Sequence, residues 1–171
     1  MDQVLETNRL LLRRIRPTDG SFLCTILQNR EVMYAWDHAF SDQEVADWIQ
    51  ENLMRYDRDG YSYWTVVEKA SNSPVGVCGL IAEQADQEPY VGIGYIFQKR
   101  VWGQGYAFES ATACVEYAAH VLHCKEVTAQ IRPDNIPSRR VAEKLGMVVR
   151  KAFIRIDGGK AVPHLLYGRT L

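Results

Sequence analysis

The sequence predicts one domain of mixed α/β architecture, and three observations carry that prediction. Apolar residues recur at strand spacing in some segments and at helical spacing in others. A run of three strands in the middle of the chain is followed by alternating helices and strands. With 171 residues, of which 47% are hydrophobic and 24% charged, the chain is long enough for one core and too apolar for wholesale disorder. No linker divides it, so we expect a single domain over residues 1–171.

The N-terminal third predicts one strand and two helices. The expected elements are a strand over residues 9–16, a short helix over 19–27 and a longer helix from residue 41 to just before residue 60. Pro17 ends the strand because it cannot donate to a ladder. Asp19 is a candidate N-cap for the first helix. Ser41, followed three residues later by Glu44, forms a capping box that starts the second helix.

Three strands follow and are expected to form an antiparallel meander. They cover residues 61–69, 75–82 and 90–97. The turn-rich segment 71–74 joins the first two strands, and the polar segment 84–89 joins the last two.

The C-terminal half predicts two helices and three strands. The expected elements are a long helix over 106–122, a strand over 126–131, a short helix over 137–145 and strands over 148–156 and 165–170. The long helix is indicated by one apolar stripe, made of Ala107, Ala111, Cys114, Val115, Ala118 and Leu122. The turn between the last two strands is Asp157-Gly158-Gly159.

Charge and cysteine content argue against several classes of function. The formal net charge is −1 and no stripe of Lys and Arg is present, so neither nucleic acid nor a membrane is an expected partner. No apolar run approaches the ~20 residues of a membrane span, and the N-terminus has no signal-peptide pattern. The four cysteines are scattered without a C-x-x-C pair, which predicts no metal site and suits a reducing compartment. We expect a soluble, cytoplasmic protein.

The segment from Arg100 to Ala107 is the most informative part of the sequence. It runs from a strand into the long helix, and its residues are Arg100, Val101, Trp102, Gly103, Gln104, Gly105, Tyr106 and Ala107. Glycine lets a ligand approach the main chain closely, and the first N–H groups of a helix lack intrahelical partners. Together with the helix dipole they make a cradle for a pyrophosphate. A glycine-containing turn with no ligand is the alternative.

Three ordered motifs resemble those of the GNAT superfamily of N-acetyltransferases. Arg100, Gly103 and Gly105 match the acetyl-CoA motif Gln/Arg-x-x-Gly-x-Gly/Ala. Residues 132–147 (RPDNIPSRRVAEKLGM) are similar to the second cofactor motif of the family. Residues 5–13 (LETNRLLLR) resemble the start of the branch that acetylates ribosomal-protein N-termini. No Gly-Lys-Ser/Thr follows the glycines, which argues against a P-loop.

The resemblance implies a fold and a reaction. The implied GNAT fold has a mixed central sheet, with an antiparallel N-terminal meander and two parallel strands that splay apart. The opening would take the pantetheine arm of acetyl-CoA beside Ile96 and Phe97, with Asn135 and Ser138 also in the cofactor site. The amides of residues 102–107 would hold the pyrophosphate. A primary amine would enter from the opposite side and attack the thioester directly, with acetyl-CoA as co-substrate and no metal.

Two departures from the family pattern leave the acid and the base open. Many relatives carry a Glu on the central strand where this chain has Gly92, and a Tyr where it has Ala142. The usual acid and base therefore cannot be carried over to this sequence. The candidate catalytic residues are Ser138, Asn135, His164 and Glu83. The competing explanation for each is structural, as a helix cap, a turn residue or a strand residue.

The sequence leaves the acceptor open. Residues 34–37 (YAWD) follow the first short helix, where family members build the acceptor-side wall. Without a Glu at position 92, we expect a weakly basic acceptor such as the α-amine of a peptide or protein, which titrates at about 8. The alternative function is a non-catalytic acyl-CoA-binding module of the same fold. A homodimer is left open as the assembly.

Overall fold

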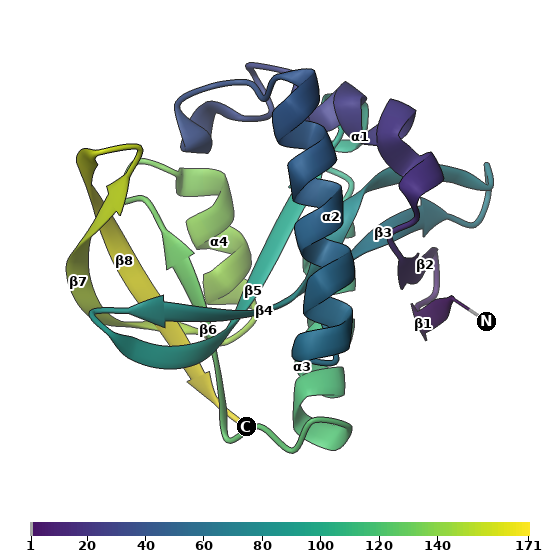
Figure 1. Cartoon of the computed structure of the whole chain (residues 1–171). Helices are drawn as coiled ribbons and strands as arrows, with labels where there is room; N and C mark the ends of the chain where they lie inside the picture. The colour runs from purple at the N-terminus through teal and green to yellow at the C-terminus, as the bar shows by residue number, and fades with distance from the viewer. Residues whose placement is uncertain (1) are drawn as a thin grey trace.

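The computed structural model describes residues 2–171 as one eight-stranded sheet with helices on both faces (Figure 1). In chain order the strands are β1 (Gln3–Glu6), β2 (Leu10–Arg14), β3 (Tyr63–Glu68), β4 (Ser73–Ala85), β5 (Glu88–Phe97), β6 (Glu126–Ile131), β7 (Val148–Asp157) and β8 (Lys160–Thr170). The helices are α1 (Gly20–Leu27), α2 (Asp42–Arg58), α3 (Tyr106–His120) and α4 (Ile136–Lys144), with 3₁₀ turns η1 (Pro17–Asp19), η2 (Tyr34–Trp36) and η3 (Lys99–Val101). The predicted mixed α/β architecture is confirmed.

The sheet opens between its two parallel strands. Its order is β1-β2-β3-β4-β5-β6-β8-β7, and every neighbouring pair is antiparallel except β5 and β6. Those two strands are paired at one position, Gly92 with Thr128. Beyond Gly92, the C-terminal part of β5 has no partner strand on that side. This confirms the predicted splay and places a free strand edge in the middle of the molecule.

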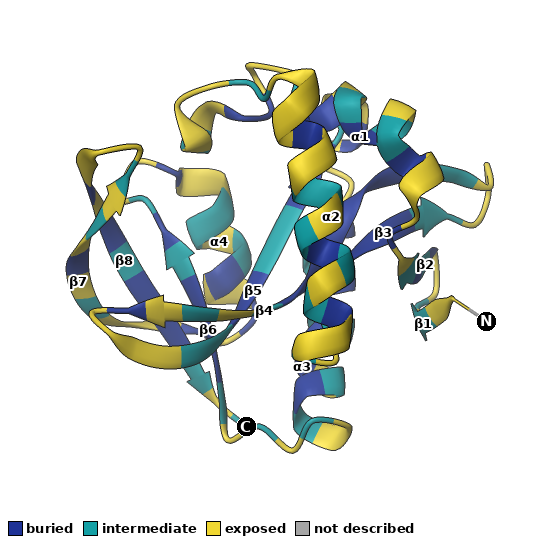
Figure 2. Cartoon of the chain, viewed as in Figure 1, coloured by how far each residue is buried: buried dark blue, intermediate teal, exposed yellow. Residues whose placement is uncertain are grey.

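Each face of the sheet carries its own apolar core. α3 and α4 cover one face, where Leu80 and Cys114 are fully buried. α1 and α2 cover the other face, where Leu23 and Val77 are fully buried. Figure 2 shows buried residues concentrated in β3 and β4, with exposed residues along the outer side of α2. Among residues 2–171, none of the helices combines the length and the hydropathy that crossing a bilayer requires.

The two predicted helix caps have different outcomes. Ser41 caps α2 as predicted, because its hydroxyl accepts from the N–H of Glu44 (3.2 Å) and the Glu44 carboxylate accepts from the N–H of Ser41 (2.7 Å). Asp19 precedes α1, but its side chain caps no N–H of that helix. Its carboxylate instead binds both Nη atoms of Arg13, at 2.7 and 2.8 Å, and the hydroxyl of Thr65. A bidentate, charge-assisted pair is stronger than a bond to a neutral amide, so the tertiary contact replaces the local one.

Strands β4, β5, β7 and β8 extend further than the sequence pattern indicates, whereas β2 and β3 are shorter than predicted. β1 is absent from the predicted set, because its four residues pair with β2 at the rim of the sheet and show no alternating pattern. The expected polar connection is a tight hairpin in which Asp86 and Gln87 have φ of 51° and 67°. β8 begins at Lys160, earlier than predicted, and includes Pro163. This proline is tolerated because β6 ends before reaching it, so no ladder bond is lost on that side.

Candidate active site

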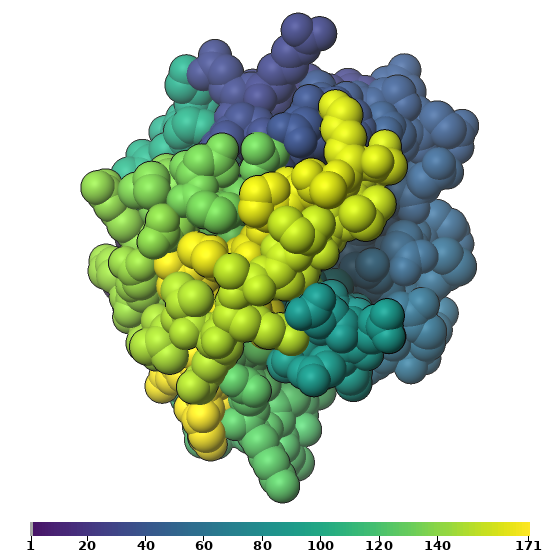
Figure 3. Space-filling model, turned by 90° about the vertical axis from the view of Figure 1, so that its left-hand side faces the viewer, coloured from purple at the N-terminus to yellow at the C-terminus, as the bar shows by residue number. Residues whose placement is uncertain are grey.

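Two cavities meet where β5 and β6 separate. The first, of about 540 Å³, lies between the end of β5 and the N-terminal ends of α3 and α4. The second, of about 630 Å³, lies between α2, strands β4 and β5, and the turn that joins β7 to β8. Figure 3 shows the surface hollowed where these last elements meet. The residues that line both cavities are Ala35, Trp36, Tyr95, Asn135 and Ser138, so the two spaces share a wall at the splay.

The glycine segment before α3 forms a main-chain cradle on the first cavity. Gly103 and Gly105 have φ of 76° and 82°, a left-handed conformation that side chains disfavour. No atom lies within 4 Å of the place that a Cβ on Gly103 would take. The carbonyl of Gly105 accepts from the N–H of Glu109, which leaves the N–H groups of residues 106–108 without intrahelical partners. Such amides at the positive end of a helix are a site for phosphate oxygens.

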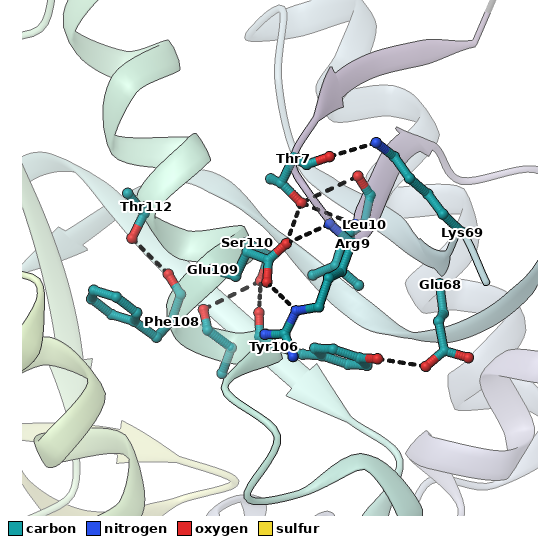
Figure 4. Close-up of polar contacts among 11 residues, drawn as sticks. Thr7, Arg9, Leu10, Glu68, Lys69, Tyr106, Phe108, Glu109, Ser110 and Thr112 are labelled. Carbon is teal, nitrogen blue, oxygen red and sulfur yellow. Dashed lines mark hydrogen bonds and ion pairs between the residues drawn. The ribbon is translucent and has the colours of Figure 1, made fainter. Parts of the chain in front are cut away.

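A polar cluster ties the start of α3 to the N-terminal segment (Figure 4). Glu109, in the first turn of α3, accepts from the Thr7 hydroxyl (2.6 Å), from the N–H of Arg9 (2.9 Å) and from Arg9 Nε (2.6 Å). The Arg9 guanidinium also lies over the Tyr106 ring, 4.6 Å from its centroid. The Tyr106 hydroxyl in turn donates to Glu68 of β3. The N-terminal motif therefore positions the helix whose amides form the cradle.

Most of the predicted cofactor residues line the first cavity. They are Ile96, Phe97, Val101, Trp102, Gly103, Gly105, Tyr106, Ala107, Asn135 and Ser138. Arg100 and Gln104 do not line it, and both are exposed. The lining residues outside the predicted cofactor set are Val32, Tyr34, Ala35, Trp36, Tyr95, Phe108, Pro137, Arg140, Val141 and Lys144, and residues 34–36 among them were expected in the acceptor-side wall. Arg140 and Lys144 are four positions apart and therefore lie on the same side of α4. Two cations at this spacing in the sequence could have indicated that the helix faces an anionic ligand.

The second cavity carries charges of both signs. Its acidic lining residues are Asp37, Glu44, Glu83 and Asp157, and its basic ones are Arg55, Arg132 and Arg155. Arg132 pairs with Asp37 at 2.7 Å, and Arg155 pairs with Asp157 at 2.7 Å. Glu83 forms no ion pair with any other residue in the described part of the chain.

The Glu83 carboxylate occupies the space that a side chain at Gly92 would take. Glu83 lies on β4 and Gly92 on the neighbouring strand β5, on the same face of the sheet. A Cβ on Gly92 would lie 2.0 Å from Glu83 Oε1, so position 92 admits no side chain while Glu83 keeps this conformation. Burial raises the pKa of Glu83 to about 7, although Arg155 and Arg55 oppose the shift. A carboxyl group that titrates near neutral pH and faces a cavity is suited to accept a proton.

The other candidate catalytic residues lie on the same two cavities. His164 of β8 lines the second cavity, and burial lowers its pKa. Its Nδ1 lies 3.0 Å from the carbonyl oxygen of Val162. Asn135 is the N-cap of α4, where its side-chain oxygen accepts from the N–H of Ser138 (3.3 Å). The helix cap, which was the structural alternative for Ser138, is therefore Asn135. Both residues lie on the wall that the two cavities share.

Comparison with known families identifies the chain. A family model described as an acetyltransferase (GNAT) domain matches residues 9–148. The chain belongs to the GNAT acetyltransferase family. The uncharacterised protein YkkB of Bacillus subtilis is 33% identical to this GNAT chain over 150 residues, which is 87% of each protein. The uncharacterised N-acetyltransferase p20 of Bacillus licheniformis is 27% identical over 167 residues, covering 96% of this chain and 92% of p20.

A solved GNAT structure shares the fold over its whole length. RimL, a ribosomal L7/L12 α-N-protein acetyltransferase solved in complex with coenzyme A, superposes with a TM-score of 0.82 at 19% identity, over 99% of this chain and 98% of RimL. The predicted likeness to ribosomal-protein acetyltransferases is confirmed for the fold. This chain is an acetyl-CoA-dependent N-acetyltransferase. Its glycine cradle, with the cations Arg140 and Lys144 on the same cavity, fits the anionic co-substrate.

In this GNAT enzyme, a loop from the N-terminal half lies at the junction between the two cavities. The hydroxyl of Tyr34 in η2 donates to Asn135 Oδ1. Three residues later, Asp37 accepts from Arg132 Nη1 at 2.7 Å. Both contacts join the loop to the segment between β6 and α4. Tyr34 lines the first cavity and Asp37 the second, so the loop forms part of both walls.

Proposed function

We propose that this enzyme transfers the acetyl group of acetyl-CoA to the α-amine of a peptide or protein. The observation that supports this best is the wall shared by the two cavities. A thioester in the first cavity and an amine in the second would meet beside Tyr95, Asn135 and Ser138. The amine then attacks directly in a ternary complex, and the acetyl group never resides on the protein. The cysteines at positions 24, 78, 114 and 124 line neither cavity, which also favours direct attack.

Glu83 acts as the general base in this reaction. Its carboxylate faces the second cavity, where the amine enters, and its pKa is raised to about 7. Once ionised, it accepts the proton that the amine nitrogen loses as the N–C bond forms. Gly92 is required for this role because a Cβ at position 92 would displace the carboxylate. The Glu missing from β5 is thus replaced from β4, and the amine attacks in its neutral form.

The charges of the second cavity favour a peptide α-amine over a polyamine. A polycation calls for a clear excess of acidic groups, whereas three arginines offset the acids here. Arginine N–H groups are also suited to bind the carbonyl oxygens of a peptide main chain. RimL is by name an acetyltransferase of the α-amine of ribosomal protein L7/L12, and its fold is the same. Both observations support a peptide N-terminus as the acceptor.

The other three candidate catalytic residues, Asn135, Ser138 and His164, position the reactants. Asn135 and Ser138 contact the reactants at the shared wall, where the Asn135 side chain keeps the first turn of α4 in place. His164 stays neutral at pH 7 because burial lowers its pKa, and its ring lies 5.8 Å from the ring of Phe153. It therefore forms part of the acceptor wall, while the proton goes to Glu83.

An acceptor panel tests this function. Thiol release from acetyl-CoA is measured with a peptide bearing a free N-terminus, a free amino acid, an Nα-blocked lysine and spermidine, at several concentrations of each. We expect the highest kcat/KM for the peptide. A preference for spermidine would overturn the peptide assignment. Binding of coenzyme A without thiol release on any acceptor would support the alternative, an acyl-CoA-binding module without turnover.

A further inference from the structure

We propose that Tyr34 is the general acid that protonates the departing sulfur of coenzyme A. This inference rests on the proposed acetyl transfer and adds a residue that the sequence motifs do not indicate. Ala142, at the position where many relatives carry a tyrosine, is 1% exposed and has no proton to give. Breaking the thioester leaves a thiolate unless a group on the first cavity supplies a proton. The acid must therefore be one of the donors that line this cavity.

Three other proton donors on the first cavity, Tyr95, Tyr106 and Lys144, also have partners, and none of them bonds to the Asn135 side chain as Tyr34 does. Tyr95 donates its hydroxyl to the carbonyl oxygen of Ser138 (3.0 Å). Tyr106 donates its hydroxyl to a carboxylate of β3. The ammonium group of Lys144 lies over the Phe108 ring, 4.5 Å from its centroid. The Ser138 hydroxyl lies on the shared wall, but an aliphatic alcohol is a far weaker acid than a phenol.

Tyr34 combines access to the first cavity with a fixed orientation. Its side chain lines that cavity, and the residue is 46% exposed. Its hydroxyl bonds to Asn135 Oδ1, which also accepts the N–H of Ser138. Asn135 and Ser138 belong to both cavities, so the phenol is held where the thioester and the amine meet. Rotation about its C–O bond turns the proton from Asn135 toward the sulfur.

The surroundings of Tyr34 keep the phenol protonated at neutral pH. Burial and the negative charge of Asp134 raise the pKa of Tyr34 above its ordinary value, and Arg132 opposes them. The other charged or titratable groups on the first cavity are Tyr95 of β5, Tyr106 of α3, and Arg140 and Lys144 of α4, and Asp37 follows on the same loop as Tyr34. The cations among them stabilise negative charge on sulfur and on the phenolate while the proton moves.

The step balances in atoms and electrons. The amine nitrogen forms the N–C bond with its lone pair, and the C–S bond breaks with its electron pair going to sulfur. Glu83 takes a proton from the nitrogen, and Tyr34 gives its hydroxyl proton to the sulfur. Solvent returns a proton to Tyr34 and takes one from Glu83. The products are an acetylated amine and the thiol of coenzyme A.

A phenylalanine variant separates proton donation from binding. Tyr34→Phe keeps the ring and removes the proton, so we expect kcat at pH 7 to fall by at least ~10²-fold. The Kd for coenzyme A, measured by calorimetry, should stay unchanged. Tyr61→Phe is the matched control, because the half-buried Tyr61 lies outside both cavities and its variant should keep the wild-type kcat.

A fluorinated tyrosine at position 34 tests the proton itself. In the wild type, kcat should decline at high pH as Tyr34 loses its proton. A fluorotyrosine, whose phenol is more acidic, should move this decline to lower pH, and Tyr34→Phe should lack it. An unchanged kcat in Tyr34→Phe, or a decline that the fluorotyrosine does not move, would overturn the role of Tyr34 and leave acetyl transfer standing. Failure of the wild type to acetylate any amine would overturn the proposed function instead.

Discussion

At the scale of single residues, the missing side chain at position 92 determines where the proposed base, Glu83, lies. β4 and β5 are paired side by side, so a Glu on either strand can reach the same space. Gly92 leaves that space open and the Glu83 carboxylate occupies it. Burial then raises the pKa of Glu83 to about 7, so the folded protein holds the proton more tightly than the unfolded chain does.

We predict that the carboxylate can be moved from one strand to the other. Glu83→Gln should lower kcat/KM at pH 7 by ~10²-fold or more and remove the rise in activity near that pH. Gly92→Glu alone should also lose activity because its side chain overlaps Glu83. Gly92→Glu combined with Glu83→Ala should recover part of the loss. pH–rate profiles of these variants check the prediction, and a double variant as inactive as Glu83→Gln would contradict it.

The stability of the Glu83→Gln variant shows whether a loss of activity comes from the missing base or from misfolding. Because the pKa of Glu83 is raised in the folded state, stability falls as the pH rises from the ordinary value of a glutamate to about 7. Removing the charge should therefore leave the variant at least as stable as the wild type at pH 8, measured by denaturant unfolding. A large loss of stability there would mean that the carboxylate supports the fold.

At the scale of elements, the site depends on the N-terminal end of α3. The glycine segment gives the main chain its left-handed conformation, and the first turn of α3 exposes its amides to the first cavity. Glu109 holds that turn against Thr7 and Arg9, which precede β2. The cradle is thus assembled from two segments that are distant in the sequence.

We predict that Gly105→Asp weakens coenzyme A binding at least ~10-fold, which is about 1.4 kcal/mol. The new carboxylate would stand among the amides that hold phosphate, at a φ of 82°. Gly60→Asp is the matched control, since Gly60 has a φ of 85°, no atom within 4 Å of its Cβ position and no place on either cavity. Calorimetry with coenzyme A measures both variants. Equal affinities in two folded variants would mean that the phosphates bind elsewhere.

At the scale of the whole molecule, a largely buried ion pair connects the strands to the helical layer. Asp19, at the start of α1, binds Arg13 of β2 and Thr65 of β3. Burial alone would raise the pKa of Asp19, but the hydrogen bonds from Arg13 and from the N–H of Arg16 outweigh it and hold the pKa below its usual value. The ionised form therefore stabilises the fold.

We predict that Asp19→Asn lowers the free energy of unfolding at pH 7 by about 2 kcal/mol, because it leaves Arg13 without its charged partner. With a depressed pKa, the contribution of Asp19 is complete above the ordinary aspartate value and disappears as the pH falls below it. The difference between variant and wild type should accordingly shrink in acid. Asp2→Asn, in the exposed pair with Arg16, is the control and should change stability by less than about 1 kcal/mol. An equal effect of both variants would contradict the assignment.

The sequence by itself determined the family, the order of the main elements and half of the residues that line the first cavity. The patterns that predicted them act between residues close together in the chain. A capping box, a glycine segment that enters a helix and an apolar stripe all act over a few residues, so their patterns are visible without the fold. The capping box at Ser41 and the cavity lining by Gly103 and Gly105 are found as predicted.

Only the tertiary structure decided which groups face each other at the reaction centre. Glu83 lies over Gly92 because of the register between β4 and β5, and the Tyr34 hydroxyl reaches Asn135 across 101 residues of chain. Asp19 likewise binds Arg13 of the sheet instead of capping α1. In each case, the side chain could bind several kinds of partner. The partner that it does bind is the one that the packing of distant segments brings close to it. Local patterns do not encode that packing, so the choice of Glu83 among the candidate residues and the role proposed for Tyr34 both depend on the assembled structure.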